Sequence, residues 1–74
     1  MKNEFIEKLS DILEIEKESI SLDCKFRELQ NWDSLASLSL SAMINEDFDL
    51  VIPKTDFENL VTVDDLIMYI ESNK

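Results

Sequence analysis

Apolar residues recur at helical spacing in separate stretches of this chain of 74 residues, and that periodicity limits its fold more than any other feature. In the first stretch they follow one another at steps of one, three, three and one, as Phe5, Ile6, Leu9, Ile12 and Leu13. Because residues three and four apart share one face of a helix, this spacing predicts an amphipathic helix from Asn3 to about Ile15.

A second helix is predicted from Ser34 to about Asp47. Asp33 stands immediately before it and is a natural N-cap residue. Its apolar residues have the loose three-and-four spacing of a helix buried along one side, and they are Leu35, Leu38, Ala42, Ile44 and Phe48. The chain has no glycine, so Asp49 is expected to supply the helix-ending turn that glycine normally provides.

The last part of the chain predicts two more helices and no sheet. Leu50 to Ile52 resembles a strand, but a lone run of this length has no partner for a ladder, so we interpret it as a connection that ends at Pro53. A short helix is expected from Thr55 to Leu60. Thr62 to Asp65 resembles a capping box that uses aspartate in place of glutamate, and the helix that it opens is expected to end near Ser72. The inward stripe of this last helix is Val63, Leu66, Ile67 and Ile70.

Residues 16–32 form a long connection in which the helical periodicity lapses. A loop of this length inside a small domain is usually functional or pinned down. The apolar residues expected to pin it are Ile20, Leu22, Phe26 and Leu29. The predicted fold is therefore all-α, a small four-helix bundle with three longer helices and one short one, in which residues 1–74 form a single domain.

The charge balance restricts the partners. The chain has 7 Lys and Arg against 17 Asp and Glu, which gives a formal net charge of -10. This charge argues against nucleic acid and anionic lipid, and it favours basic protein surfaces as docking targets. No segment has the pattern of a signal peptide or of a membrane span. The single cysteine, Cys24, cannot form an internal disulfide, so the expected location is cytoplasmic.

Missing residue types exclude several kinds of chemistry. Without glycine the chain cannot build a Walker loop or a dinucleotide-binding turn, because both need backbone to approach phosphate closely. It has no histidine and one cysteine, which removes the usual general base, the Ser-His pairing and most zinc sites. We therefore expect no catalytic residues and no metal site.

Residues 31–35 read Asn-Trp-Asp-Ser-Leu and place Ser34 in the first turn of the second helix. There its hydroxyl is expected to face solvent. A phosphate esterified to it would lie beside unpaired backbone N–H groups and the positive end of the helix dipole, which suits a tethered phosphodiester. From the helix signals alone, an ordinary first-turn serine fits equally well.

The order of elements resembles the acyl carrier protein family over nearly the whole chain. The residues that carry the resemblance are Phe26, Asp33-Ser34-Leu35, Phe48, Ile52, Pro53, Thr62 and Val63. The resemblance implies that Ser34 carries 4′-phosphopantetheine as a covalent cofactor, transferred from coenzyme A by a magnesium-dependent phosphopantetheinyl transferase. It also implies a monomeric carrier rather than an enzyme, which delivers acyl thioesters to acyl-activating and acyl-transfer enzymes with basic or apolar docking surfaces.

The resemblance also assigns roles to neighbours of Ser34. In the family, the aspartate that matches Asp33 helps the transferase position its metal, besides capping the helix. The leucine that matches Leu35 is a partly exposed apolar anchor beside the arm, whereas periodicity alone places Leu35 in the core. Leu38 and Ala42 lie on the same side and are candidates for partner contact or for lining the space that receives an acyl chain. Core packing is the default expectation for Leu38.

Departures from the family pattern bear on the partner enzymes. Gln30-Asn31-Trp32 stands where many carriers have Leu-Gly-x. The second helix has neutral residues where fatty-acid carriers place acids, namely Ala36, Ser37, Ser39, Ser41 and Asn45. These departures predict dedicated partner enzymes of a specialised pathway that recognise shape and apolar contacts near Leu35. Trp32 is expected to pack over the loop, and Cys24 to be a small, partly buried filler.

Other interpretations stay open. The nearest is an aminoacyl or peptidyl carrier, but such carriers often show a Gly-Gly pair before the site or a bulkier residue after it, and neither is present. An unmodified acidic helical adaptor would bind a protein groove and would not need Ser34. An acidic mimic of nucleic acid is poorly supported, because the charge is moderate and the apolar stripes are well formed.

Overall fold

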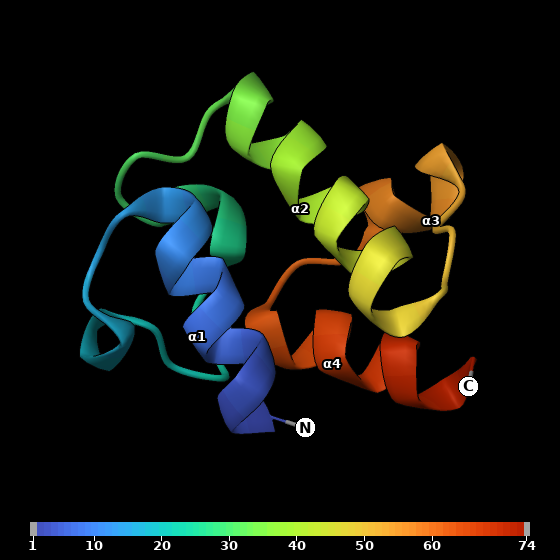
Figure 1. Cartoon of the computed structure of the whole chain (residues 1–74), viewed down its shortest axis with the longest axis horizontal. Helices are drawn as coiled ribbons and strands as arrows, with labels where there is room; N and C mark the ends of the chain where they lie inside the picture. The colour runs from blue at the N-terminus through green and yellow to red at the C-terminus, as the bar shows by residue number, and fades with distance from the viewer. Residues whose placement is uncertain (1, 74) are drawn as a thin grey trace.

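The computed structural model describes residues 2–73, and within them the chain is helical (Figure 1). The α-helices are α1 (Lys2–Leu13), α2 (Ser34–Phe48), α3 (Lys54–Asn59) and α4 (Val63–Ser72), and the 3-10 helices are η1 (Lys17–Ser19) and η2 (Phe26–Glu28). The β pairing found in residues 2–73 is one isolated bridge between Lys25 and Thr62. The predicted all-α bundle, with three longer helices and one short one, is confirmed.

Three helices and the long connection build one core. In Figure 1, α2 runs along the upper part of the molecule and α4 along the lower part, α1 lies at the left, and α3 lies at the right, beside the C-terminal end of α2. The buried apolar residues are Phe5, Leu9, Leu13, Ile20, Phe26, Ala36, Leu40, Ile44, Val63, Leu66, Ile67 and Ile70. The predicted inward stripe of the last helix is confirmed, as is the pinning of the connection, since Ile20 and Phe26 are buried while Leu22 and Leu29 pack against the core.

The buried face of α2 differs from the one that its apolar run predicts. Ala36, Leu40 and Ile44 lie in the core at steps of four, whereas Leu35 and Leu38 are 70% and 69% exposed and Ala42 is exposed too. The core assignment of Leu35 and Leu38 from periodicity is therefore wrong. The physical reason is that α2 has apolar residues on two faces, so spacing alone does not define which face meets the other helices.

Within residues 2–73, three residues other than glycine have left-handed backbone, namely Glu14, Asn31 and Asp49, whose φ angles are 56°, 69° and 53°. Asp49 ends α2, as predicted. Glu14 ends α1 two residues before the predicted end, because the amides of Ile15 and Glu14 donate to the carbonyls of Ser10 and Asp11 over 3.1 and 3.3 Å. This is the Schellman pattern of helix termination.

The predicted capping box opens α4. Thr62 Oγ1 accepts from the amide of Asp65 over 3.1 Å, and Asp65 Oδ2 accepts from the amides of Thr62 and Val61 over 3.0 Å each. Donation from these amides, first that of Thr62, lowers the pKa of Asp65 below its ordinary value. The long connection of residues 16–32 is bound to this N-terminal end of α4, because the amides of Val63 and Asp64 donate to the carbonyls of Cys24 and Leu22.

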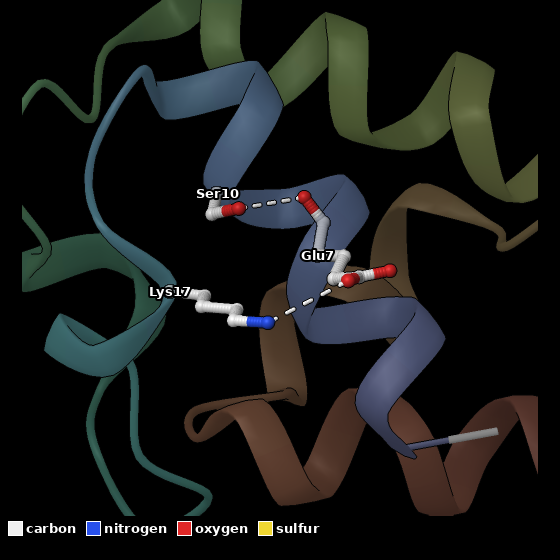
Figure 2. Close-up of polar contacts among 3 residues, drawn as sticks. All are labelled: Glu7, Ser10 and Lys17. Atoms are coloured by element: carbon white, nitrogen blue, oxygen red, sulfur yellow. Dashed lines mark hydrogen bonds and ion pairs between the residues drawn. The ribbon is translucent and has the colours of Figure 1, made fainter.

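Polar contacts join α1 to its neighbours. Lys8 Nζ lies 3.1 Å from Asp47 Oδ2 in α2, and this hydrogen bond raises the pKa of Lys8. Figure 2 shows Lys17 of η1 reaching back to α1, with Nζ 3.7 Å from Glu7 Oε1. In the same view Ser10 Oγ donates over 2.7 Å to the carbonyl oxygen of Glu7, which satisfies a buried hydroxyl.

Candidate functional site

Ser34 is the first residue of α2 and is exposed. Asp33 precedes it in extended backbone, and its Oδ1 accepts from the amide of Ala36 over 2.8 Å. The first backbone hydrogen bond of the helix runs from the amide of Ser37 to the carbonyl of Asp33 over 3.0 Å. The predicted N-cap and the predicted start of the helix are both confirmed.

This arrangement leaves two amides at the position where a phosphate on Ser34 would lie. The amides of Ser34 and Leu35 come before the first intrahelical hydrogen bond, so the helix itself offers them no acceptor. They also mark the positive end of the helix dipole. An exposed hydroxyl beside donors and positive potential fits a phosphodiester on Ser34 Oγ.

Aromatic packing holds the approach to Ser34. Trp32 is half-buried, and its ring meets that of Phe26 edge to face, with centroids 5.2 Å apart and planes at 72°. The amide of Trp32 donates to the carbonyl of Leu29 over 3.2 Å, and Asn31 Nδ2 donates to the carbonyl of Leu13 over 2.8 Å. Trp32 packs over the loop, as predicted, and Cys24 is the expected half-buried filler.

The outer face of α2 is apolar and uncharged for most of its length. Leu35, Leu38 and Ala42 are separated by three and four residues, so they share this face, and all of them are exposed. No charged residue occurs from Ser34 to Asn45. The outer face therefore differs from the rest of this acidic chain.

A groove separates α2 from α3 and has a volume of about 450 Å³. Ser37, Leu38 and Ser41 form its α2 wall, and Lys54 and Phe57 belong to its α3 wall. Leu38 on the α2 side was predicted as a candidate lining residue of a space for an acyl chain. The α3 wall was not predicted, because nothing in the spacing of residues 54–58 shows which neighbour they face.

Arg27 holds the α3 wall in place. Its guanidinium donates to the carbonyl oxygen of Phe57 over 2.7 Å and to that of Leu60, which end α3. The guanidinium carbon also lies 4.5 Å from the centroid of the Phe26 ring and 5.1 Å from that of Phe57. Because α3 has no buried residue of its own, this cation stabilises the helix end through both its charge and its planar stacking.

No group of three or more His, Cys, Asp or Glu side chains in residues 2–73 could hold a metal ion. None of the described helices has the length and apolarity needed to cross a membrane.

Comparisons with known proteins identify the family of this chain. Residues 3–70 match the family described as "Phosphopantetheine attachment site". An acyl carrier protein of Phytoplasma australiense is 38% identical over 61 residues, which cover 82% of this chain and 80% of that protein. One of Akkermansia muciniphila is 36% identical over 61 residues, covering 82% and 76%. One of Wolinella succinogenes is 36% identical over 62 residues, covering 84% and 82%. The chain therefore belongs to the acyl carrier proteins, which are carriers with a phosphopantetheine attachment domain and not enzymes.

Proposed function

We propose that Ser34 Oγ is the atom that carries 4′-phosphopantetheine, and that the chain presents acyl groups as thioesters on the thiol of that arm. The observation that carries this proposal is the exposed hydroxyl at the first position of α2, beside amides that have no intrahelical acceptor. The arm supplies the thiol that holds the acyl group and the length that lets this thiol extend to a partner enzyme. The chain's residues hold the attachment point still, since Asp33 caps the helix and Trp32 packs on Phe26.

Attachment needs a separate enzyme, and a phosphopantetheinyl transferase is the proposed one. Ser34 Oγ forms the new bond to phosphorus while coenzyme A loses its adenosine 3′,5′-bisphosphate part, and the hydroxyl proton passes to a base of that enzyme. Asp33 stands beside Ser34 with its Oδ1 engaged by the amide of Ala36. A carboxylate in this place also offers an oxygen ligand to the transferase's magnesium ion.

Delivery depends on the outer face of α2. Leu35, Leu38 and Ala42 are exposed beside the attachment point, and no charge interrupts them. Basic enzyme surfaces that recognise an acidic helix have little to bind here, whereas an apolar depression can bury the leucines. We therefore propose that this carrier works with dedicated enzymes of a specialised pathway. We also propose a cytoplasmic location, because the single Cys24 requires no oxidising compartment. Equal acyl-exchange rates with housekeeping fatty-acid enzymes, measured beside an ordinary carrier, would refute the assignment to a specialised pathway.

Intact mass tests the attachment. Incubation of the unmodified protein with coenzyme A and a permissive phosphopantetheinyl transferase is expected to add the mass of one phosphopantetheine group. Ser34→Ala should abolish the addition, and Ser39→Ala, which changes another exposed serine of α2, should leave it intact. Addition to Ser34→Ala, or none to the wild type, would overturn the proposal. An unmodified adaptor would show no addition in any of these samples.

A further inference from the structure

The loop that leads to Ser34 is tied to a distant helix by the side chain of Asn31. Asn31 lies three residues before Ser34, in left-handed backbone with a φ angle of 69°. Asparagine is one of the few residues other than glycine that adopts this backbone readily, because its short polar side chain can form hydrogen bonds nearby. Here the bond is a distant one, since Asn31 Nδ2 donates over 2.8 Å to the carbonyl oxygen of Leu13, 18 residues earlier.

The acceptor of this bond belongs to the end of α1. Leu13 is the last residue of α1, and its side chain is buried. The last carbonyls of a helix have no intrahelical donor. Those of Ser10 and Asp11 accept from the amides that follow the helix, and that of Leu13 accepts from Asn31. Asn31 thus completes the end of α1 and fixes the loop against it, and Figure 1 shows this end of α1 beside the loop that enters α2.

Three consecutive residues each contact a different element before the chain reaches Ser34. Asn31 is bonded to α1, and the carboxylate of Asp33 caps α2. Between them, the ring of Trp32 packs on Phe26 of η2, with centroids 5.2 Å apart. A loop held at successive residues has little freedom to rotate, so these contacts together set the direction of the Ser34 hydroxyl. Asn31 supplies the link to α1.

Loading at Ser34 depends on that direction. A transferase must bring Ser34 Oγ up to the phosphorus of coenzyme A, roughly in line with the bond that breaks. Misplacement of a reacting group by about 1 Å can cost on the order of 100-fold in rate. A serine whose loop can swing relative to α1 therefore reaches the productive geometry less often.

We propose that Asn31 is a positioning residue for phosphopantetheine loading, and that it acts by tying the Ser34 loop to the end of α1. The proposal rests on attachment at Ser34. Asn31 acts through the placement of Ser34 and not on the transferred group. Its hydrogen bond to Leu13 keeps the hydroxyl in the orientation that the transferase uses.

Two glycine variants isolate the tether. Asn31→Gly removes the side-chain donor, and glycine adopts the left-handed backbone of that position without steric cost. Asn73→Gly is the matched control, because Asn73 Nδ2 also donates over 2.8 Å to a carbonyl near a helix end, that of Tyr69 in α4. Both asparagines are exposed, and the C-terminal end of α4 lies across the molecule from the start of α2 (Figure 1). Each variant should lower the melting temperature by about 2–12 °C, as for the loss of one hydrogen bond in a small domain.

Single-turnover loading separates positioning from stability. Each unmodified protein is incubated with coenzyme A and an increasing excess of a permissive transferase, at a temperature where its melting curve shows it folded, and the added mass is followed in time. Asn31→Gly should lower the rate constant reached at saturating transferase by about 5–50-fold, which is part of the loss for a displacement of about 1 Å. Asn73→Gly should keep the wild-type rate constant. Partial unfolding would instead raise the transferase concentration needed for half saturation and leave the saturating rate unchanged, and that pattern for Asn31→Gly would overturn the proposal.

Emission from Trp32, the one tryptophan of the chain, reports on the same loop without any loading. Asn31→Gly should shift the emission maximum to longer wavelength and increase quenching by acrylamide, because the ring packs less firmly on Phe26, whereas Asn73→Gly should match the wild type. A saturating rate that is unchanged in Asn31→Gly, or equally lowered in both variants, would overturn the proposal, and so would unchanged Trp32 emission and quenching. Failure of the wild type to load is instead a failure of the attachment at Ser34, which the mass spectrum reports separately, and the Trp32 measurement then still tests the tether.

Discussion

Truncation of Leu40 in α2 should cost much more stability than truncation of Leu38. Leu40 is 0% exposed and Leu38 is 69% exposed, although both lie near the middle of the helix. Leu40→Ala removes buried methyl groups and leaves a cavity, which costs about 2–5 kcal/mol. Leu38→Ala removes side-chain atoms that water already reaches, so its effect should stay within about 0.5 kcal/mol.

The loss at Leu40 is large relative to what a chain of this size can have. At roughly 0.05–0.15 kcal/mol per residue, its free energy of unfolding is about 4–11 kcal/mol. Leu40→Ala should therefore lower the melting temperature by about 8–40 °C, at about 4–8 °C for each kcal/mol in a small domain. If the stability of the wild type lies at the low end of that range, the largest of these losses would leave the Leu40→Ala variant largely unfolded at room temperature.

Urea unfolding followed by circular dichroism measures both variants. The midpoint should fall sharply for Leu40→Ala and hardly move for Leu38→Ala, with unchanged slopes. Comparable losses at the two positions, or a larger loss for Leu38→Ala, would show that α2 faces the core with its other side. The outer apolar face proposed for docking would then be part of the core.

Three further outcomes are expected. Amide donation lowers the folded-state pKa of Asp65 below the unfolded value of 3.8, so the stability that Asp65 contributes is present above that value and is lost as pH falls through the folded pKa. Asp65→Asn should therefore lower the free energy of unfolding near neutral pH and reduce the further loss of stability on acidification. Equal stability-against-pH profiles for the variant and the wild type would contradict this. Glu14→Gly removes a side chain from left-handed backbone at φ 56° and should raise the free energy of unfolding by about 0.5–1 kcal/mol. The urea midpoint measures this change, and a lower midpoint would show that the backbone at Glu14 is not strained. Moderate salt should raise the melting temperature because it screens repulsion among the acids of a chain with net charge -10, and an unchanged value would show that they are too dispersed to matter.

Sequence spacing was sufficient where one face of a helix is clearly apolar or where a cap has local partners. The last helix satisfies both conditions, since its stripe is buried and the Thr62 to Asp65 box involves residues three apart. The end of α2 at Asp49 and the cap at Asp33 are similarly local, because each depends on the backbone of its immediate neighbours. These features needed no knowledge of tertiary contacts.

Sequence spacing was insufficient where tertiary contacts determine which residues are buried and which distant residues meet. The face of α2 that meets the core was mispredicted because Leu35 and Leu38 are as apolar as Leu40, and the choice between the faces depends on the other helices. The contacts of Arg27 with Phe57 and Leu60 span 30 and 33 residues, and no local pattern indicates them. The α2–α3 groove therefore became apparent only with the fold.

Peptide-level mass spectrometry of the loaded protein tests the attachment claim most directly. After digestion, fragmentation of the peptide that contains the start of α2 should place the phosphopantetheine group on Ser34, whose hydroxyl is exposed at the first helical position. Modification of any other serine, or an unmodified Ser34 in a protein whose total mass has increased, would contradict the account.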